Sequence, residues 1–226
     1  MLIQVPHVLK GDALAGVRAE LEQADWADGR GSAGYLSAAV KDNSQLPDAS
    51  PVARKLGETI LRALEGNALF TSASLPFKVM PPQFNRYTGN QNYGRHIDGA
   101  IRQIAGSVHR IRTDLAATLF LTPPDDYDGG ELVVEDTFGP RSIKLGAGDM
   151  VLYPGTSVHR VAPVTRGTRL AAFFWVQSHV REDARRTILF ELDSAIQRIA
   201  ADVPKHASLV DLAGVYHNLL RTWADA

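Results

Sequence analysis

The spacing of apolar residues in the first third of the chain is typical of amphipathic helices. Leu14, Val17 and Leu21 recur with helical spacing. Further on, Ser50 followed by Pro51 forms an N-cap and first-turn pair ahead of a second apolar stripe. We therefore predict that the chain opens with a mainly helical part.

The pattern between Phe77 and Ser178 changes to short β-rich runs separated by Gly, Pro and Asp. These runs are Phe84–Tyr87, Leu115–Leu121, Glu131–Val134, Met150–Tyr153 and Leu170–Val176. Such a series is typical of a β-sandwich or jelly roll and differs from the alternating strands and helices of a parallel sheet. We predict a mainly β fold with flanking helices, in which a jelly-roll core covers residues of about 77–178.

Helical periodicity returns from about Glu182. The apolar positions are Ile188, Leu189, Leu192, Ile196 and Ile199, and then Leu209, Leu212, Val215, Tyr216, Leu219 and Leu220. Ser208 and Asp211 fit a capping-box-like start of the second helix. Because each apolar stripe must be covered, we expect a helical C-terminal subdomain (residues 181–226) packed beside the first domain (residues 1–180). Its helix faces, such as the one with Leu212, Tyr216 and Leu219, could also serve self-association into a homo-oligomer.

The composition of the chain restricts its partners. A formal net charge of -1 gives no bias toward nucleic acid or an anionic membrane. No stretch approaches the roughly 20 apolar residues of a membrane span, and the first ten residues lack a basic leader. Cysteine is absent, so any bound metal would need His, Asp or Glu ligands. We expect a cytoplasmic protein with a small-molecule or peptide substrate, and neither nucleic acid nor a membrane as partner.

Two histidines stand in settings that favour metal binding. His96 and Asp98 are two residues apart, so an extended chain would project both from one face. A surface turn would explain this triplet as well. His159 follows a Pro-Gly turn and opens an apolar run, as expected for a ligand delivered from a neighbouring strand. Two imidazoles and one carboxylate leave open positions that suit iron(II), although the same set could bind zinc for hydrolysis.

Arg169 separates these two kinds of metal chemistry. It lies ten residues after His159 and opens the apolar strand that ends in Phe173-Phe174-Trp175. A guanidinium that points into a β-rich pocket needs an anion, and the distal carboxylate of 2-oxoglutarate would be a suitable bidentate partner. The competing interpretation places Arg169 at an exposed strand end, paired with a surface acid.

The remaining histidines and a group of arginines are weaker candidates. A basic cluster near His109 comprises Arg95, Arg102, Arg110 and Arg112; it could bind an acidic substrate or phosphate, but a solvated loop is the simpler interpretation. His179, His206 and His217 lie in or beside the C-terminal helices, and we do not expect them to be ligands.

The motif His96-X-Asp98, then His159, then Arg169 resembles that of the 2-oxoglutarate/iron(II) dioxygenase superfamily. Within it, the chain is similar to the bacterial PKHD-type hydroxylases, relatives of prolyl 4-hydroxylase found with iron-uptake functions. The resemblance extends over nearly the whole length and includes Asn85-Arg86-Tyr87, Asp128-Gly129-Gly130-Glu131-Leu132 and Gly148-Asp149.

This resemblance implies a double-stranded β-helix, with iron bound by His96, Asp98 and His159 and the C5 carboxylate of 2-oxoglutarate bound by Arg169. It implies Tyr87 as a second cosubstrate contact, no catalytic side chain beyond the metal centre, and L-ascorbate dependence. Some relatives supply a further tyrosine from the next core strand. Here Leu119 and Phe120 stand in that region, so we leave that role unfilled.

Two other functions remain open at this stage. One is a cupin-like metal protein of the same architecture without oxygenase activity, which would not turn over 2-oxoglutarate. The other is a nucleic-acid demethylase of the same superfamily, which the near-neutral charge disfavours. The prime substrate, whether a prolyl or lysyl side chain, a free amino acid or a siderophore-related compound, is not readable from the sequence.

Overall fold

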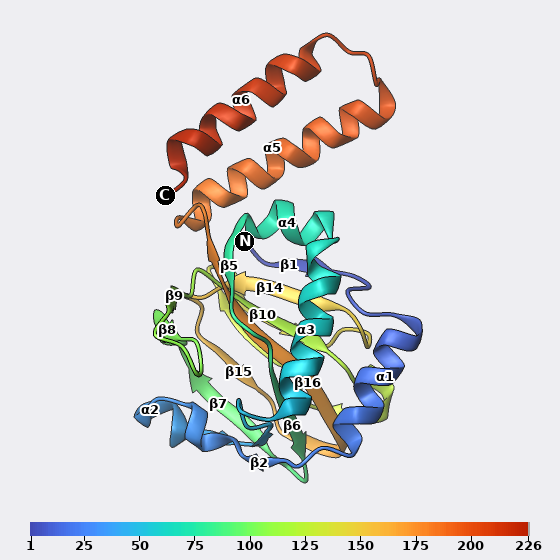
Figure 1. The fold of residues 1–226 in the computed structure, drawn as a ribbon, viewed down its shortest axis with the longest axis vertical. Helices are drawn as coiled ribbons and strands as arrows, with labels where there is room; N and C mark the ends of the chain where they lie inside the picture. Colours follow the sequence, from blue (N-terminus) through green and yellow to red (C-terminus); the bar gives the residue numbers. More distant parts are fainter. Residues whose placement is uncertain (226) are drawn as a thin grey trace.

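The computed structural model describes residues 1–225 (Figure 1). The helices are α1 (Gly11–Glu22), α2 (Tyr35–Ala38), α3 (Pro51–Glu65), α4 (Ala68–Ser74), α5 (Asp183–Asp202) and α6 (Ser208–Trp223). The strands are β1 (Ile3–Val5), β2 (Ala27–Asp28), β3 (Lys41–Asp42), β4 (Ser44–Gln45), β5 (Pro76–Val79), β6 (Gln83–Thr88), β7 (Asn92–His96), β8 (Ile101–Gln103), β9 (Arg110–Arg112), β10 (Leu115–Phe120), β11 (Tyr127–Gly129), β12 (Leu132–Asp136), β13 (Gly139–Ile143), β14 (Met150–Pro154), β15 (His159–Val161) and β16 (Val164–Ser178).

Two antiparallel sheets form the body of the molecule. The major sheet has the order β1-β14-β10-β16-β6-β4-β2, and β11 and β5 also pair with β16. The minor sheet has the order β13-β12-β15-β7-β3, and β8 pairs separately with β9. The jelly-roll core predicted from the short β-rich runs is confirmed, and each of the five runs lies within a strand or extends one residue beyond it.

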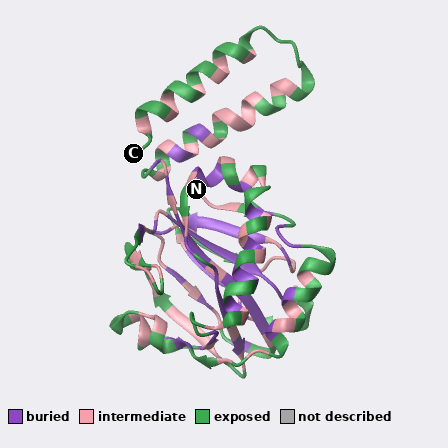
Figure 2. Ribbon diagram, viewed as in Figure 1, coloured by how far each residue is buried: buried purple, intermediate pink, exposed green. Residues whose placement is uncertain are grey.

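The alternation of side chains along β10 explains why the major sheet has a core on each face. Leu115, Ala117 and Leu119 belong to the cluster that packs under the helices. Ala116 and Phe120 belong to a second cluster, which fills the space between the two sheets. Because successive strand residues point to opposite faces, one apolar run is buried on both sides (Figure 2).

The helices α1, α3 and α4 cover the outer face of the major sheet. Val17 and Leu21 of α1 and Leu56 and Ile60 of α3 are buried in the cluster under these helices. The predicted start of α3 is confirmed, because the Ser50 hydroxyl accepts a hydrogen bond from a backbone N–H in the first turn of the helix.

The first third of the chain is not wholly helical, and here the prediction was incomplete. Ile3–Val5 adds an edge strand beside β14, and Lys41–Asp42 pairs with β7 of the minor sheet. Strands of two or three residues show no hydrophobic period of their own. They form because their backbone groups pair with strands that are distant in the sequence.

The helices α5 and α6 form an antiparallel hairpin that projects from one end of the body (Figure 1). At its base, Leu189 packs with Leu75 and Val180, and Tyr216 and Leu219 pack against this group. The face of α6 considered for self-association is therefore half-buried inside the hairpin's own contacts. Among residues 1–225, no helix is long and apolar enough to cross a membrane.

The capping box expected at Ser208 is wrong. Ala207 precedes the first turn of α6, and no side chain caps that end. The Ser208 backbone N–H instead donates to Nδ1 of His206. Ser208 therefore lies one position inside the helix, where its hydroxyl cannot serve as the N-cap.

Candidate metal centre and its cavity

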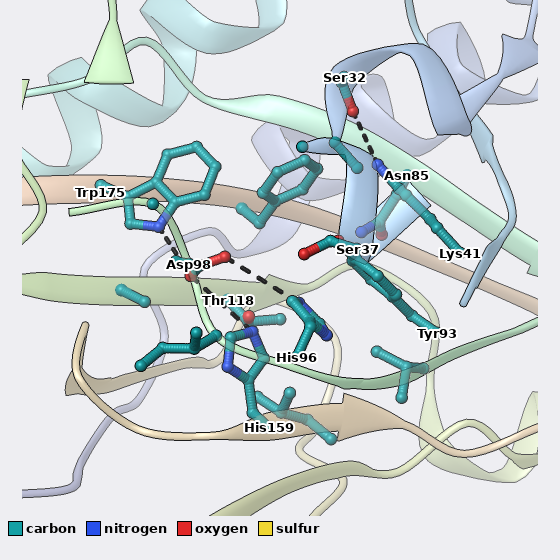
Figure 3. Close-up of a pocket in the computed structure, with 18 of the residues that line it drawn as sticks. Ser32, Ser37, Lys41, Asn85, Tyr93, His96, Asp98, Thr118, His159 and Trp175 are labelled. Carbon is teal, nitrogen blue, oxygen red and sulfur yellow. Dashed lines mark hydrogen bonds and ion pairs between the residues drawn. The ribbon is translucent and has the colours of Figure 1, made fainter. Parts of the chain in front are cut away.

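The two predicted histidines are brought together by strand register. His96 ends β7 and His159 begins β15, and the two residues are direct antiparallel partners. Their rings approach to 4.2 Å between centroids. Asp98 lies in the loop that leaves β7, so its side chain returns to the same point (Figure 3).

The ligand atoms of His96, Asp98 and His159 all lie within 4.8 Å of one another. His96 Nε2 is 4.0 Å from Asp98 Oδ1, and His159 Nε2 is 3.8 Å from Asp98 Oδ2. No other cluster of three potential ligands was found among residues 1–225. Two imidazoles and one carboxylate converging on one point fit a divalent first-row metal such as iron(II).

The backbone fixes which ring nitrogen of each histidine faces the carboxylate. His96 Nδ1 lies 2.8 Å from the Gly94 carbonyl oxygen, and His159 Nδ1 lies 3.1 Å from that of Ser157. When Nδ1–H donates to a carbonyl, Nε2 keeps a free lone pair for a metal. Burial, followed by the neighbouring His159, lowers the pKa of His96 to about 4, so this ring is neutral at pH 7. The ring of Tyr93 stacks on it at 3.6 Å.

Trp175 orients the carboxylate and was missed as a site residue. Its indole Nε1–H donates to Asp98 Oδ2 at 2.9 Å (Figure 3). Strand alternation divides the Phe173-Phe174-Trp175 run between the two faces of β16. Phe174 is buried under the helices, and Phe173 and Trp175 face the space between the sheets. Strand alternation gave the direction of the indole, but its partner could not be derived from the sequence.

Arg169 lies inside the sandwich, because it shares the strand face of Phe173 and Trp175. Its side chain is 1% exposed, and its Nε and Nη1 atoms have no hydrogen-bond partner. Among residues 1–225 no carboxylate lies within 4.0 Å of its guanidinium. The competing interpretation, an exposed strand end paired with a surface acid, is wrong. A buried, unpaired guanidinium is costly unless an anion binds there, so this group fits a carboxylate ligand.

Gly130 makes the space for this arginine. A Cβ atom at Gly130 would lie 3.0 Å from Cδ of Arg169 and 2.9 Å from the ring of Tyr127. The residue also has a φ of +67°, a conformation that L side chains rarely adopt. The Gly-Gly pair in the sequence motif thus allows Arg169 and Tyr127 to approach each other.

Tyrosine hydroxyl groups surround the arginine. Tyr87 is the direct cross-strand partner of Arg169, and its hydroxyl is buried without a hydrogen-bond partner, as is that of Tyr127. Burial raises the pKa of Tyr87 to about 12, so this hydroxyl remains a donor. The Tyr127 signal in the sequence was its position beside the Gly-Gly pair. Of the two residues considered for a further tyrosine role, Phe120 lies near the guanidinium and Leu119 points under the helices.

These groups line one cavity of about 350 Å³. The three clustered ligands, Arg169 and Tyr87 all contribute to its wall. The cavity wall also includes Arg102, whose guanidinium stacks on Trp175 at 4.0 Å, and Lys41, whose ammonium lies among polar side chains of the N-terminal segment. Lys41 was not a sequence candidate, because it lies in a two-residue strand without a recognisable motif.

The other histidines do not join the site. His109, His206 and His217 are exposed, and His179 packs against Phe77. None of these four residues lines the cavity.

Comparisons with known proteins agree with this arrangement. Residues 82–177 match the model of the 2OG-Fe(II) oxygenase superfamily, and residues 183–225 match the PKHD-type hydroxylase C-terminal domain. A PKHD-type hydroxylase of Bordetella pertussis is 58% identical over 225 residues, and PiuC, a PKHD-type hydroxylase of Pseudomonas aeruginosa, is 56% identical; each match covers 100% of both chains. The fold is similar to that of a Pseudomonas putida prolyl-4-hydroxylase, with a TM-score of 0.52 and 20% identity over 78% of this chain and 92% of that chain.

Proposed function

Because the chain belongs to the PKHD-type hydroxylases, within the 2-oxoglutarate/iron(II) oxygenases, we propose that His96, Asp98 and His159 hold the iron and that Arg169 binds 2-oxoglutarate. The protein is an iron(II)- and 2-oxoglutarate-dependent dioxygenase that hydroxylates an unidentified substrate. The proposal adds the residues that serve this activity.

A single observation supports the cosubstrate assignment most strongly. Arg169 is fully buried without an acidic partner, in the same cavity as the three clustered ligands. A metal site for binding or hydrolysis alone would have no need for a desolvated guanidinium beside the metal. A dicarboxylate that chelates the metal at one end needs such a group at the other end.

The residues of this chain bind and orient the reactants. When bound, iron(II) and 2-oxoglutarate supply O2 activation, with release of succinate and CO2. Arg169 would bind the distal carboxylate through paired N–H groups, and Tyr87 would donate its hydroxyl to the same ligand. Trp175 would hold Asp98 in the orientation that a ligand needs. The apolar residues between the sheets would exclude water, so that the protein contributes positioning and leaves the oxidative chemistry to the cofactors.

Anaerobic titration of the iron-loaded protein with 2-oxoglutarate tests the role of Arg169. The signal is the weak visible charge-transfer band of an iron(II)–2-oxoglutarate chelate. A charge-assisted hydrogen bond contributes roughly 1.5–3 kcal/mol, so Arg169→Ala should raise the dissociation constant about tenfold or more while iron binding survives. Arg169→Lys keeps the charge but loses the planar fork, so its dissociation constant should lie between those of the wild type and Arg169→Ala. Unchanged affinity in Arg169→Ala would remove this residue from the cosubstrate site and favour the cupin-like alternative.

The proposal has further parts. L-ascorbate as a reductant and a role connected with iron uptake rest on the family alone. A cytoplasmic location, self-association through the C-terminal helices, and a domain boundary near residue 180 rest on the sequence pattern. Succinate formation with and without ascorbate, and the mass of the protein in solution, would test the first and the fourth.

A further inference from the structure

The basic cluster near His109 divides into residues with different roles. Arg95 pairs with Glu135, and both side chains lie on the surface. Arg112 pairs with Asp114 and Asp225. Arg110 is exposed and does not line the cavity. Arg102 alone turns inward, so the arginines do not form one binding surface.

The guanidinium of Arg102 is held in the cavity wall by neutral groups. It stacks on the ring of Trp175 at 4.0 Å, and its Nη2 atom donates to the Ser32 carbonyl at 3.3 Å. Among residues 1–225 it has no carboxylate within 4.0 Å. The stacking fixes the plane of the guanidinium, and its remaining N–H groups are available to a ligand.

Lys41 also contacts Ser32 (Figure 3). Its ammonium donates to Ser32 Oγ at 2.7 Å and to Gln45 Oε1 at 2.9 Å, although the side chain is only 5% exposed. Within the described chain no carboxylate lies within 4.0 Å of this nitrogen either. Two cations therefore converge on Ser32 without an acidic partner.

The net charge of the residues that line the whole cavity is also positive. Its charged lining residues are Lys41, Arg102 and Arg169 against the single carboxylate of Asp98, which leaves an excess of two positive charges. Iron(II) and the 2-oxoglutarate dianion carry opposite formal charges of equal size, so filling the proposed site would leave this excess unchanged. A third reactant that carries negative charge would offset it, whereas a cationic one would be repelled.

We propose that the prime substrate of this enzyme carries a carboxylate, which binds in this cavity to Arg102 with Lys41 beside it. This inference rests on the proposed function, because it assigns the third reactant of the same site. It selects an anionic small molecule or an acidic side chain and excludes a cationic lysyl side chain. The indole of Trp175, with Arg102 on its face, forms the wall against which the substrate's carbon skeleton lies.

Matched acids and amides of one skeleton test the proposal. The probes are N-acetyl-L-proline with N-acetyl-L-prolinamide, and N-acetyl-L-leucine with its amide. Each is titrated by anaerobic calorimetry into protein loaded with iron(II) and 2-oxoglutarate. The acid of a pair should bind about tenfold or more tightly than the amide, since a charge-assisted bond is lost with the carboxylate. Arg102→Gln should abolish most of this preference, Arg102→Lys should keep part of it, and Lys41→Met should reduce it.

Arg110→Gln is the matched control, because Arg110 lies in the same strand pair as Arg102 but outside the cavity. It should keep the full preference. Equal affinity for acid and amide, no binding of either probe pair, or an acid preference that persists in Arg102→Gln would each overturn the proposal. If the charge-transfer band forms in the wild type but the acid preference is absent, only this inference fails. If the preference is present and the band is not, the cosubstrate assignment fails.

Discussion

Two arginines, Arg169 in the cavity and Arg186 at the base of the C-terminal hairpin, are equally buried at 1% exposed, but their surroundings differ. Nη1 of Arg186 donates at 2.7 Å to the carbonyls of Val180 and Arg181, and its Nη2 donates to Asp183 at 3.1 Å. Arg169 has no carboxylate partner. Partners within the chain compensate the desolvation of a buried charge, and a buried charge without partners indicates a ligand site.

The same contrast holds between the two regions. At the hairpin base, Asp183 pairs with Arg186 and also with the ammonium of Met1, so the buried polar groups are largely satisfied within the chain. Around Arg169, Tyr87 in the cavity wall and Tyr127 behind it have buried hydroxyls without partners. Burial alone therefore does not distinguish a structural residue from a binding residue; what separates these two arginines is the carboxylate partner that Arg186 has and Arg169 lacks.

The largest effect that separates the regions should be on iron binding. His96→Ala, Asp98→Ala and His159→Ala should each weaken iron binding roughly a hundredfold or more, since loss of even an outer-shell group can cost 10–100-fold. The exposed His109→Ala and His206→Ala should bind iron like the wild type. Metal content after anaerobic loading measures this, and full iron occupancy in His159→Ala would disprove the assignment.

The second effect concerns the stability of the metal-free protein. Arg186→Met leaves two carbonyls and one oxygen of Asp183 without their donor, although Asp183 keeps its pair with the Met1 ammonium, and it should lower the free energy of unfolding by roughly 3–5 kcal/mol. Arg169→Met removes an unpaired buried charge, so it should change this free energy by less than about 1 kcal/mol or raise it. Urea unfolding compares the two variants. Equal losses would mean that the contrast between the two arginines has no energetic basis.

A smaller effect should come from Trp175→Phe, which keeps an aromatic ring but removes the N–H donor to Asp98. We expect roughly tenfold weaker iron binding, the scale of an orienting group behind a ligand. Trp26→Phe is the control, because the Trp26 indole donates to the Leu21 carbonyl, remote from the clustered ligands. Competition with a chelator gives both affinities, and equal values in the two variants would contradict the orienting role.

The smallest effect is a pH dependence. Burial, followed by the charge of Arg102, lowers the pKa of Lys41 from 10.5 to about 8. Between these values the unfolded chain binds a proton that the folded chain has lost, so the free energy of unfolding should rise with pH across this window. Relative to Lys41→Met, the rise should be on the order of 1 kcal/mol. Urea unfolding of the wild type and of Lys41→Met at pH 8 and pH 10.5 measures this rise. The same change with pH in both proteins would show that the pKa of Lys41 is not lowered in the folded protein.

The sequence predicted the part of the site that depends on local geometry. Spacing placed His96 and Asp98 on one segment, and alternation along β16 agrees with Arg169 pointing inward. The direct pairing of His96 with His159 depends on strand register across the fold, which no local pattern encodes. Lys41 reaches the cavity from a strand too short to predict. The hairpin was expected beside the jelly roll, but its two apolar stripes cover each other in part and contact the body only at the base.

Gly130 shows how this arrangement limits the mutations that the gene can tolerate. It has no side chain to bind or react with anything, yet a single methyl group there would press on both Arg169 and Tyr127. A missense scan of the gene should therefore score this codon alongside those of His96, Asp98 and His159. Selection on the proposed cosubstrate site would act through an empty volume as strongly as through a functional group.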